Sequence, residues 1–255
     1  PIKSSAASDV YKRQDTVTGI LSAIYDAWKR EKNSENCSIA LRGKVEAELF
    51  CDYVEVEETE HKARAVEAMI CKHLGMDVYG DLYQAMLSED EEKGDAVLGT
   101  MLEARKIPDS RKIMEHLSHP KVEKVFELSR SVGAEAHSLK GFVRFKELSG
   151  GILYSEIAPK SQVLTCLAPH FADRLSTENW MICDKTHEEY AVHEAGKRWV
   201  LVQNEGIDPA MVRDVSEREL MYEKLWRGFC HTISIKEREN LKSQRGHLSL
   251  IHISE

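Results

Sequence analysis

The positions of hydrophobic residues divide the chain into a mostly helical first half and a strand-rich second half. Apolar residues recur every three to four positions, as on one face of a helix, at residues 16–32, 59–74, 78–87, 91–106, from 120 to about 135, 161–175 and from 216 onward. Short runs of β-branched, aromatic or alternating residues, typical of strands, lie at 47–57, 142–148, 152–157, 180–184, 189–193 and 198–202. The pattern predicts helices and strands that are segregated along the chain.

Capping residues support several of these helices. Thr16 or Thr18 precedes the first helix and Thr59 the second, while Pro120 suits the first position of a later one. The other expected signals are a C-cap at Gly75, an N-cap at Ser161 and a capping box formed by Ser216 and Glu219.

Two adjacent glycines predict a β-hairpin. Gly150 and Gly151 separate the strands expected at 142–148 and 152–157, and a two-residue turn favours glycine. If both glycines occupy the turn, Arg144 and Lys146 share a face with Ser155, whereas Val143, Phe145, Ile152 and Tyr154 share the other. A slip of one residue would invert that assignment.

These elements indicate an α+β fold. The three short strands between residues 180 and 202 are spaced as an antiparallel meander, which we expect to join the hairpin in one antiparallel sheet with packed helices. We therefore expect a mostly helical region at 15–119 and an α+β region at 120–248, with a boundary near 107–120. Residues 1–14 and 249–255 lack periodicity, and we expect them to be non-native flanks.

Composition narrows the class of protein. No apolar run approaches the roughly 18–20 residues that span a bilayer, and the six cysteines are scattered singly rather than in the pairs of a zinc or disulfide framework. We expect a cytoplasmic protein with no membrane partner and no cofactor or metal. The formal charge of −8 argues against binding nucleic acid through the overall field, although a local basic patch remains compatible with it.

Acidic, basic and imidazole groups crowd together at residues 135–148, EAHSLKGFVRFKEL. Glu135 and His137 are candidate catalytic groups there, since histidine titrates near neutral pH. Lys140 and Arg144 are candidate phosphate contacts. The structural alternative is a helix C-terminus that carries cations, followed by a solvated strand.

The helix at 161–175 has a second polar face. Cys166, His170 and Asp173 follow one another at helical spacing, but no further ligands complete a zinc site. The more plausible arrangement is a polar cluster of His170, Arg174 and Asp184 that faces the Arg144 strand. In this arrangement His170 and Asp184 are catalytic candidates and Arg174 is a phosphate contact.

A basic stretch follows the last predicted helix, which contains Tyr222, Trp226 and Phe229. Such cations bind phosphates and such rings stack on unpaired bases, although aromatic residues at helical spacing are more often part of a core. The candidate nucleic-acid contacts in this stretch are Arg238, Asn240, Lys242, Gln244 and Arg245.

Three motifs together resemble one bacterial family. EAHSLKGFVRF, then LAPHFADRL followed by WMICDK, and finally YEKLWRGFCHTISIKEREN are similar to a domain of unknown function found in DNA metabolism or DNA repair proteins. The resemblance implies a radical-SAM protein as partner, and some members are fused to a domain of the uracil-DNA glycosylase superfamily. His187 stands near the position where members tend to carry arginine.

The resemblance and the motifs lead to three hypotheses. The first is a nucleic-acid-binding accessory or substrate-positioning module of DNA repair that works with a radical-SAM partner. The second is a hydrolase or glycosylase-like enzyme acting on nucleic acid, in which Glu135 or Asp184 orients water or a histidine. The third is a protein–protein adaptor without DNA affinity. Neither a P-loop nor a GxGxxG phosphate-binding motif is found in the sequence.

Overall fold

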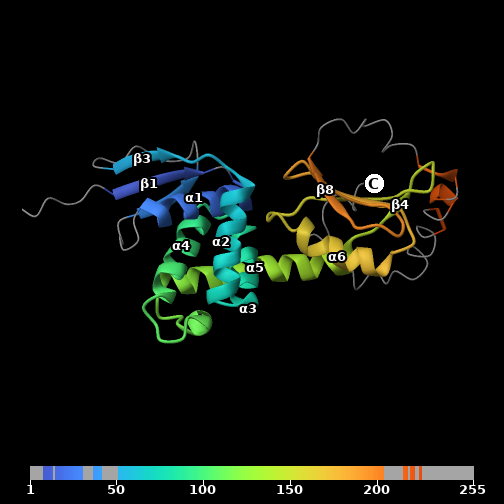
Figure 1. Cartoon of the computed structure of the whole chain (residues 1–255). Coiled ribbons are helices and arrows are strands. Elements are labelled where there is room, and N and C mark those ends of the chain that lie inside the picture. Colours follow the sequence, from blue (N-terminus) through green and yellow to red (C-terminus); the bar gives the residue numbers. More distant parts are fainter. Residues whose placement is uncertain are drawn as a thin grey trace, which may run out of the picture. The chain divides into compact units, whose positions relative to one another are not determined.

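The computed structural model describes residues 8–13, 15–30, 37–41, 51–203, 215–217, 219–221 and 224–225. The chain forms two compact units, residues 1–133 and 134–255, each of which is described by itself below. The division falls within the long helix α5 (Pro120–Phe142), later in the chain than the region 107–120 considered above (Figure 1).

The first unit combines a small parallel sheet with helices. Its strand order is β2 (Cys37–Leu41), β1 (Ser8–Arg13) and β3 (Cys51–Glu55), and both pairs are parallel. Residues 8–13, set aside in the sequence analysis, thus form the central strand. The helices of this unit are α1 (Val17–Arg30), α2 (Glu60–His73), α3 (Met76–Met86), α4 (Lys93–Ala104), the 3₁₀ helix η1 (Ser110–Glu115) and the first part of α5.

The expected caps define the ends of these helices. The hydroxyl of Thr16 accepts a hydrogen bond from the Gly19 N–H at 2.8 Å, and that of Thr59 accepts one from the Lys62 N–H. Gly75 has a φ of 97°, which suits glycine after a helix C-terminus. Pro120 is the first residue of α5. The predicted helix starts are therefore confirmed at these positions.

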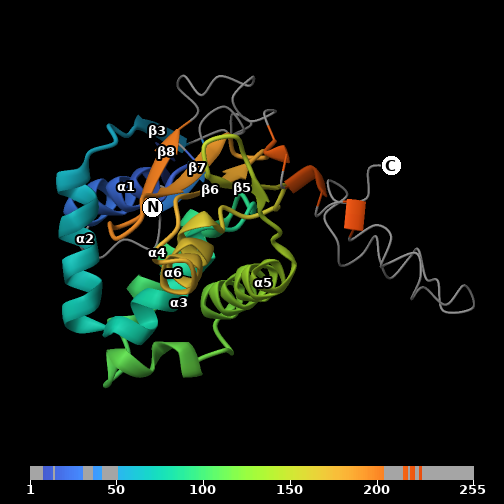
Figure 2. The same ribbon diagram turned by 90° about the vertical axis from the view of Figure 1, so that its right-hand side faces the viewer.

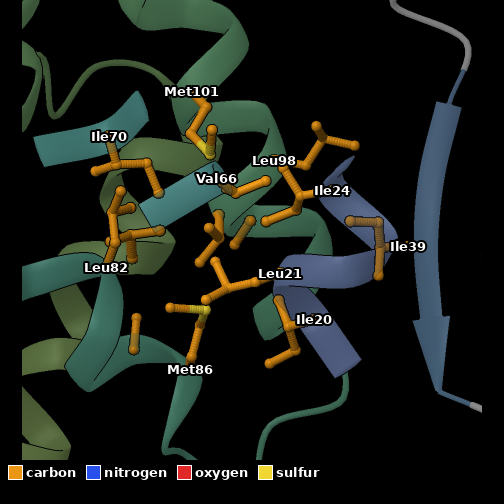
Figure 3. Close-up of a cluster of buried hydrophobic side chains, with 14 of the residues drawn as sticks. Ile20, Leu21, Ile24, Ile39, Val66, Ile70, Leu82, Met86, Leu98 and Met101 are labelled. Atoms are coloured by element: carbon orange, nitrogen blue, oxygen red, sulfur yellow. The ribbon is translucent and has the colours of Figure 1, made fainter. Parts of the chain in front are cut away.

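The core of the first unit lies between its helices and the β2 strand (Figure 3). Each fully buried Leu or Ile contributes about 1.5–3 kcal/mol relative to an exposed one. The charged side chain of Lys93 is also buried here. Its ammonium group is satisfied, since it donates to the Ser88 carbonyl at 2.6 Å and pairs with Asp15 at 2.7 Å. The labelled core residues in Figure 3 include Ile20, Ile24, Ile70, Leu82, Met86 and Leu98.

The second unit is built on a five-stranded sheet. The strand order is β4 (Lys146–Glu147), β5 (Leu153–Ile157), β6 (Trp180–Asp184), β7 (Glu189–His193) and β8 (Val200–Gln203). Helix α6 (Leu164–Arg174) packs against one face of this sheet (Figure 2). There the ring of Phe171 packs edge-on against that of buried Trp180, with ring centroids 6.5 Å apart. The predicted apolar stripe of this helix is confirmed, since Val163, Leu164, Leu167 and Phe171 are buried.

The α+β fold class is confirmed, but the second sheet is mixed rather than antiparallel. The predicted meander is present as β6, β7 and β8, whereas β5 and β6 run parallel. The physical reason is the helical connection: α6 lies between β5 and β6, so the chain crosses over and re-enters the sheet in the same direction.

The hairpin is present with a different register. Helix α5 continues to Phe142, so β4 contains only two residues. The loop of the hairpin has three residues, because Ser149 belongs to it together with Gly150 and Gly151. A hydrogen bond from the Leu148 N–H to the Ile152 carbonyl closes this loop. Lys146 is therefore opposite Tyr154 and not Ser155, and the expected faces are inverted. The glycines have φ values of 108° and 76°, which explains why both are needed in the loop.

Of the two serines predicted to cap helices, Ser161 does not act as a cap and Ser216 does. Ser161 is not the N-cap of α6, because the cap residue is Val163 and makes no side-chain capping bond. Ser216 does act as predicted, since its hydroxyl accepts from the Glu219 N–H at 3.1 Å, while the Glu219 carboxylate accepts from the Glu147 N–H. Within the described ranges, no helix combines the length and the apolar character needed to cross a bilayer.

Candidate functional site

Asp184 lies at the carboxyl end of β6 and is completely buried. Its Oδ1 accepts hydrogen bonds from the backbone N–H groups of Thr186 (2.9 Å) and His187 (3.1 Å), and its Oδ2 lies 2.7 Å from Nδ1 of His187. An aspartate whose carboxylate binds the N–H groups two and three residues later nucleates the turn that follows a strand. Asp184 therefore holds both the β6–β7 turn and the imidazole of His187.

The surroundings of His187 favour the charged form of its ring. The hydrogen bond to Asp184 is the largest cause that raises the pKa of the ring, and it outweighs the burial that acts in the opposite direction. The charges of Asp184 and Glu189 and a hydrogen bond to the backbone of Lys160 raise the pKa further. Because both partners are acceptors, both ring nitrogens of His187 donate. Burial in turn raises the pKa of the neighbouring Glu189.

Glu135 anchors the same region from helix α5. Its two carboxylate oxygens accept the N–H groups of Lys160 (2.7 Å) and Ser161 (3.1 Å), in the loop that follows β5. Since β5 and β6 are parallel, their carboxyl ends lie at one edge of the sheet, where Ile157 is in register with Asp184. We call Glu135, Lys160, Asp184, His187 and Glu189 the carboxyl-edge cluster.

The carboxyl-edge cluster is suited to holding loops in place. The carboxylates of Glu135 and Asp184 and both nitrogens of His187 are engaged by backbone groups or by one another. A general base needs an open lone pair, and a Ser or Cys nucleophile would have to lie next to it. Neither feature is found among the described contacts of His187. The described contacts of Glu135 and Asp184 thus hold the backbone of these loops.

The described contacts of Arg144, His170 and Asp184 are with other residues. No described interaction links any two of them. One guanidinium nitrogen of exposed Arg144 donates to the carbonyls of Gly141 and Val143, both at 3.0 Å, and His170 packs edge-on against the ring of Phe171.

The remaining candidates on α5 and α6 lie elsewhere in the second unit. His137 and Arg174 are exposed. Lys140 lies near Cys166, where its charge opposes the burial that raises the pKa of that thiol. Cys166 and His170 acquire no further ligands: within the part of the chain that the structure describes, no group of three or more His, Cys, Asp or Glu could hold a metal ion.

The basic candidates of the last stretch lie outside the described residues. These are Arg238, Asn240, Lys242, Gln244 and Arg245, together with the aromatic residues Tyr222, Trp226 and Phe229.

Sequence reasoning missed the role of His187, and it did not single out His193, a buried residue at the end of β7. The signal for His187 was its place three residues after Asp184 in a polar turn, DKTHEE, where an aspartate commonly binds the backbone ahead of it. His193 had no comparable signal, because a histidine at the end of an alternating strand has the same pattern as an ordinary sheet residue.

Comparison with known proteins gives one family. A family model described as a domain of unknown function, DUF4130, matches residues 91–252, a range that includes α4, α5, the whole sheet of the second unit and every candidate site residue. Comparison with curated proteins gave no match.

Proposed function

The chain belongs to the DUF4130 family of domains of unknown function, and we propose that it is a nucleic-acid-binding accessory module of DNA metabolism or repair. The partnership with a radical-SAM protein is part of the proposal and rests on the motif resemblance. The proposal places the contacts with phosphate on the second unit.

The observation that carries the proposal is a set of exposed arginines without carboxylate partners. Among the described residues, Arg144, Arg174 and Arg198 are exposed and none of them forms an ion pair. By contrast, Lys185 and Lys197 in the same unit pair with glutamates at 3.1 and 2.7 Å. A guanidinium without a carboxylate neighbour retains its fork of N–H donors for phosphate oxygens.

Of these three arginines, Arg144 has a guanidinium that backbone carbonyls already hold in place. Its two hydrogen bonds to the carbonyls of Gly141 and Val143 fix one end of the guanidinium at the end of α5. The remaining N–H groups keep their capacity to donate, and less side-chain entropy is lost when they bind. This arrangement supports a phosphate contact at Arg144.

The charge distribution is compatible with a local contact. Most of the formal charge of −8 belongs to residues 1–133, so the second unit is close to neutral. Exposed arginines on a nearly neutral unit attract phosphate with less opposition than on a strongly acidic one.

Fluorescence anisotropy with the full chain tests the proposal, using labelled single- and double-stranded DNA over a series of salt concentrations. We expect affinity to fall as salt rises, and Arg144→Ala and Arg174→Ala each to weaken binding for all sequences and to reduce the salt slope by about 1. Lys185→Ala is the matched control, since it removes one exposed but paired cation and is expected to bind as the parent does.

Two results would overturn the proposal. One is undetectable binding at about 50 mM salt, where nonspecific phosphate contacts are strong. The other is a loss in Lys185→Ala as large as that in Arg144→Ala, which would indicate that only overall charge matters.

A specific observation also favours the adaptor as a second candidate. Strand β8 lies at the edge of the sheet and exposes Val200, Leu201 and Val202, at 53%, 42% and 40% respectively. An exposed apolar edge strand is suited to pairing with a strand of another protein. Binding of a protein partner together with no DNA affinity in the titration above would favour this function.

A further inference from the structure

A pocket of about 620 Å³ opens in the second unit, at the end of the sheet where β6 begins and β7 ends. It lies within the range of roughly 300–1,000 Å³ that is usual for small-molecule sites. The pocket is at the opposite end of β6 from the carboxyl-edge cluster. Its lining includes Pro169 and Asp173 of α6, His193 of β7, and Lys197, Arg198 and Trp199 of the β7–β8 connection.

His193 is a buried residue that lines this pocket. The residue is 3% exposed, and its ring is stacked on Trp180 with centroids 5.1 Å apart and planes 9° apart. Nδ1 lies 2.9 Å from the Glu178 carbonyl, which only accepts, so Nδ1 carries the proton. The other ring nitrogen, Nε2, has no hydrogen-bond partner among the described residues. A ligand that donates an N–H to Nε2 would give this nitrogen a hydrogen-bond partner.

The pocket also contains a hydrogen-bond acceptor, a cation and an aromatic ring. Asp173 is an exposed carboxylate, hence an acceptor only, and it has no ion-pair partner within the described ranges. Arg198 offers an exposed guanidinium, whereas the neighbouring Lys197 is already paired with Glu194. Trp199 adds a half-buried aromatic ring. One pocket thus combines two acceptors, one phosphate-binding fork and one stacking surface.

We propose that this pocket binds a single nucleotide whose base presents N–H donors, with guanine as the preferred base. Guanine carries N1–H and the N2 amino group side by side, which match the two oxygens of the Asp173 carboxylate, and His193 Nε2 accepts a further N–H. The other bases present fewer donors. Trp199 stacks on the base, and Arg198 binds the phosphate.

The pocket deepens the proposed function, because it identifies the part of a nucleic acid that the module recognises. Exposed arginines hold a strand by its phosphates, while the pocket receives one base that has left the stack. Extruding an unpaired base costs little, so single-stranded DNA is the expected source. The same chemistry also fits a free nucleotide, and the experiment separates the two sources.

Isothermal titration of the full chain with the 5′-monophosphates of guanosine, adenosine, cytidine and uridine tests the pocket directly. Guanosine monophosphate is expected to bind at least fivefold more tightly than the others. Asp173→Asn should remove this preference, and Arg198→Ala and Trp199→Ala should weaken all four nucleotides by about tenfold. Trp199→Phe keeps an aromatic ring and should restore most of the affinity. Lys185→Ala is the matched control, since Lys185 is an exposed cation of the same unit that does not line the pocket.

A second arm uses oligothymidine with and without one central deoxyguanosine, with circular dichroism to confirm that each variant is folded. A preference for the deoxyguanosine strand that disappears in Asp173→Asn supports a strand as the source of the base. Selective binding of free nucleotides alone keeps the pocket and overturns the DNA-binding function. Salt-dependent strand binding that Arg144→Ala weakens, without preference among bases and without effect of Asp173→Asn, overturns the pocket and keeps the DNA-binding function. Absence of nucleotide binding at millimolar concentration in both arms overturns the pocket.

Discussion

Asp184→Asn tests whether the carboxyl-edge cluster holds the second unit together. The asparagine has the same shape and keeps one oxygen for the N–H groups of Thr186 and His187. It replaces the oxygen that binds Nδ1 of His187 with an amino group, which is a donor facing a donor. The variant therefore breaks the ion pair and leaves the rest of the turn intact.

The expected loss is about 3 kcal/mol in the free energy of unfolding of the second unit. Hydrogen bonds to charged groups contribute roughly 1.5–3 kcal/mol, and removing one partner of a buried ion pair costs roughly 3–5 kcal/mol. His187 is 18% exposed and can lose its proton, which keeps the loss at the lower end of that range. Asp184→Ala should cost more, because two backbone N–H groups would lose their acceptor as well.

Hydrogen exchange followed by mass spectrometry is the suitable assay, because the chain has two units and exchange reports local free energies. Peptides from β5 to β7 should exchange about a hundredfold faster in Asp184→Asn, while peptides from α2 and α3 should not change. Asp173→Asn, an exposed carboxylate in the same unit, is the control and should stay within about 0.5 kcal/mol. Protection in β6 that falls by less than 0.5 kcal/mol in Asp184→Asn would refute the role assigned to the cluster.

Three further predictions concern other parts of the fold. The folded-state pKa of His187 is raised, so the contribution of His187 to stability is complete below about pH 6.5 and is lost as pH rises through the folded pKa. Urea unfolding at a series of pH values should show this loss of stability. In His187→Gln the free energy of unfolding should depend less on pH over the same range. Glu135→Gln replaces one of two oxygens that accept backbone N–H groups and should lower the stability of the second unit by about 1–2 kcal/mol. In Gly99→Ala the new Cβ would lie 2.5 Å from Cγ of Lys121, and thermal unfolding of the first unit should show a loss of about 1–3 kcal/mol.

Each of these predictions has a matched control. His137→Gln removes an exposed histidine and should leave the pH dependence unchanged. Glu188→Gln changes an exposed acid and should not alter the stability of the second unit. Gly80→Ala adds a Cβ with no atom within 4 Å in helix α3 and should stabilise the first unit by about 0.5–1 kcal/mol. An equal response of variant and control would contradict the corresponding argument.

Features decided by neighbouring residues were predictable from the sequence. The starts of α1, α2 and α5 depend on Thr16, Thr59 and Pro120, which act on backbone groups within one turn. The three-strand meander was predictable for the same reason, since short connections favour antiparallel neighbours. The hairpin was found, but its register depended on whether Ser149 belongs to the strand or to the loop, and local preferences do not decide that.

Features decided by distant residues were not predictable. The parallel pairing of β5 with β6 depends on how α6 packs across the sheet, and that packing involves Phe171 and Trp180. The same holds for Glu135, which appeared as a catalytic candidate because it lies among other charged residues. Its partners, the N–H groups of Lys160 and Ser161, lie 25 and 26 residues later and have no signature of their own.

The two ends of strand β6 show why residue type alone did not locate the candidate site. At the carboxyl end, Asp184 and His187 satisfy each other and the surrounding backbone, so their polar atoms have little capacity left for a ligand. At the other end, His193 has one nitrogen without a described partner, and Asp173 and Arg198 have no ion-pair partner among the described residues. Both ends contain an acid and a histidine, and only the partners distinguish a structural cluster from a binding pocket. Ligand chemistry is therefore expected where the hydrogen-bonding capacity is unused, and nucleotide titration of Asp173→Asn against Asp184→Asn, at a temperature where both are folded, decides between the two ends.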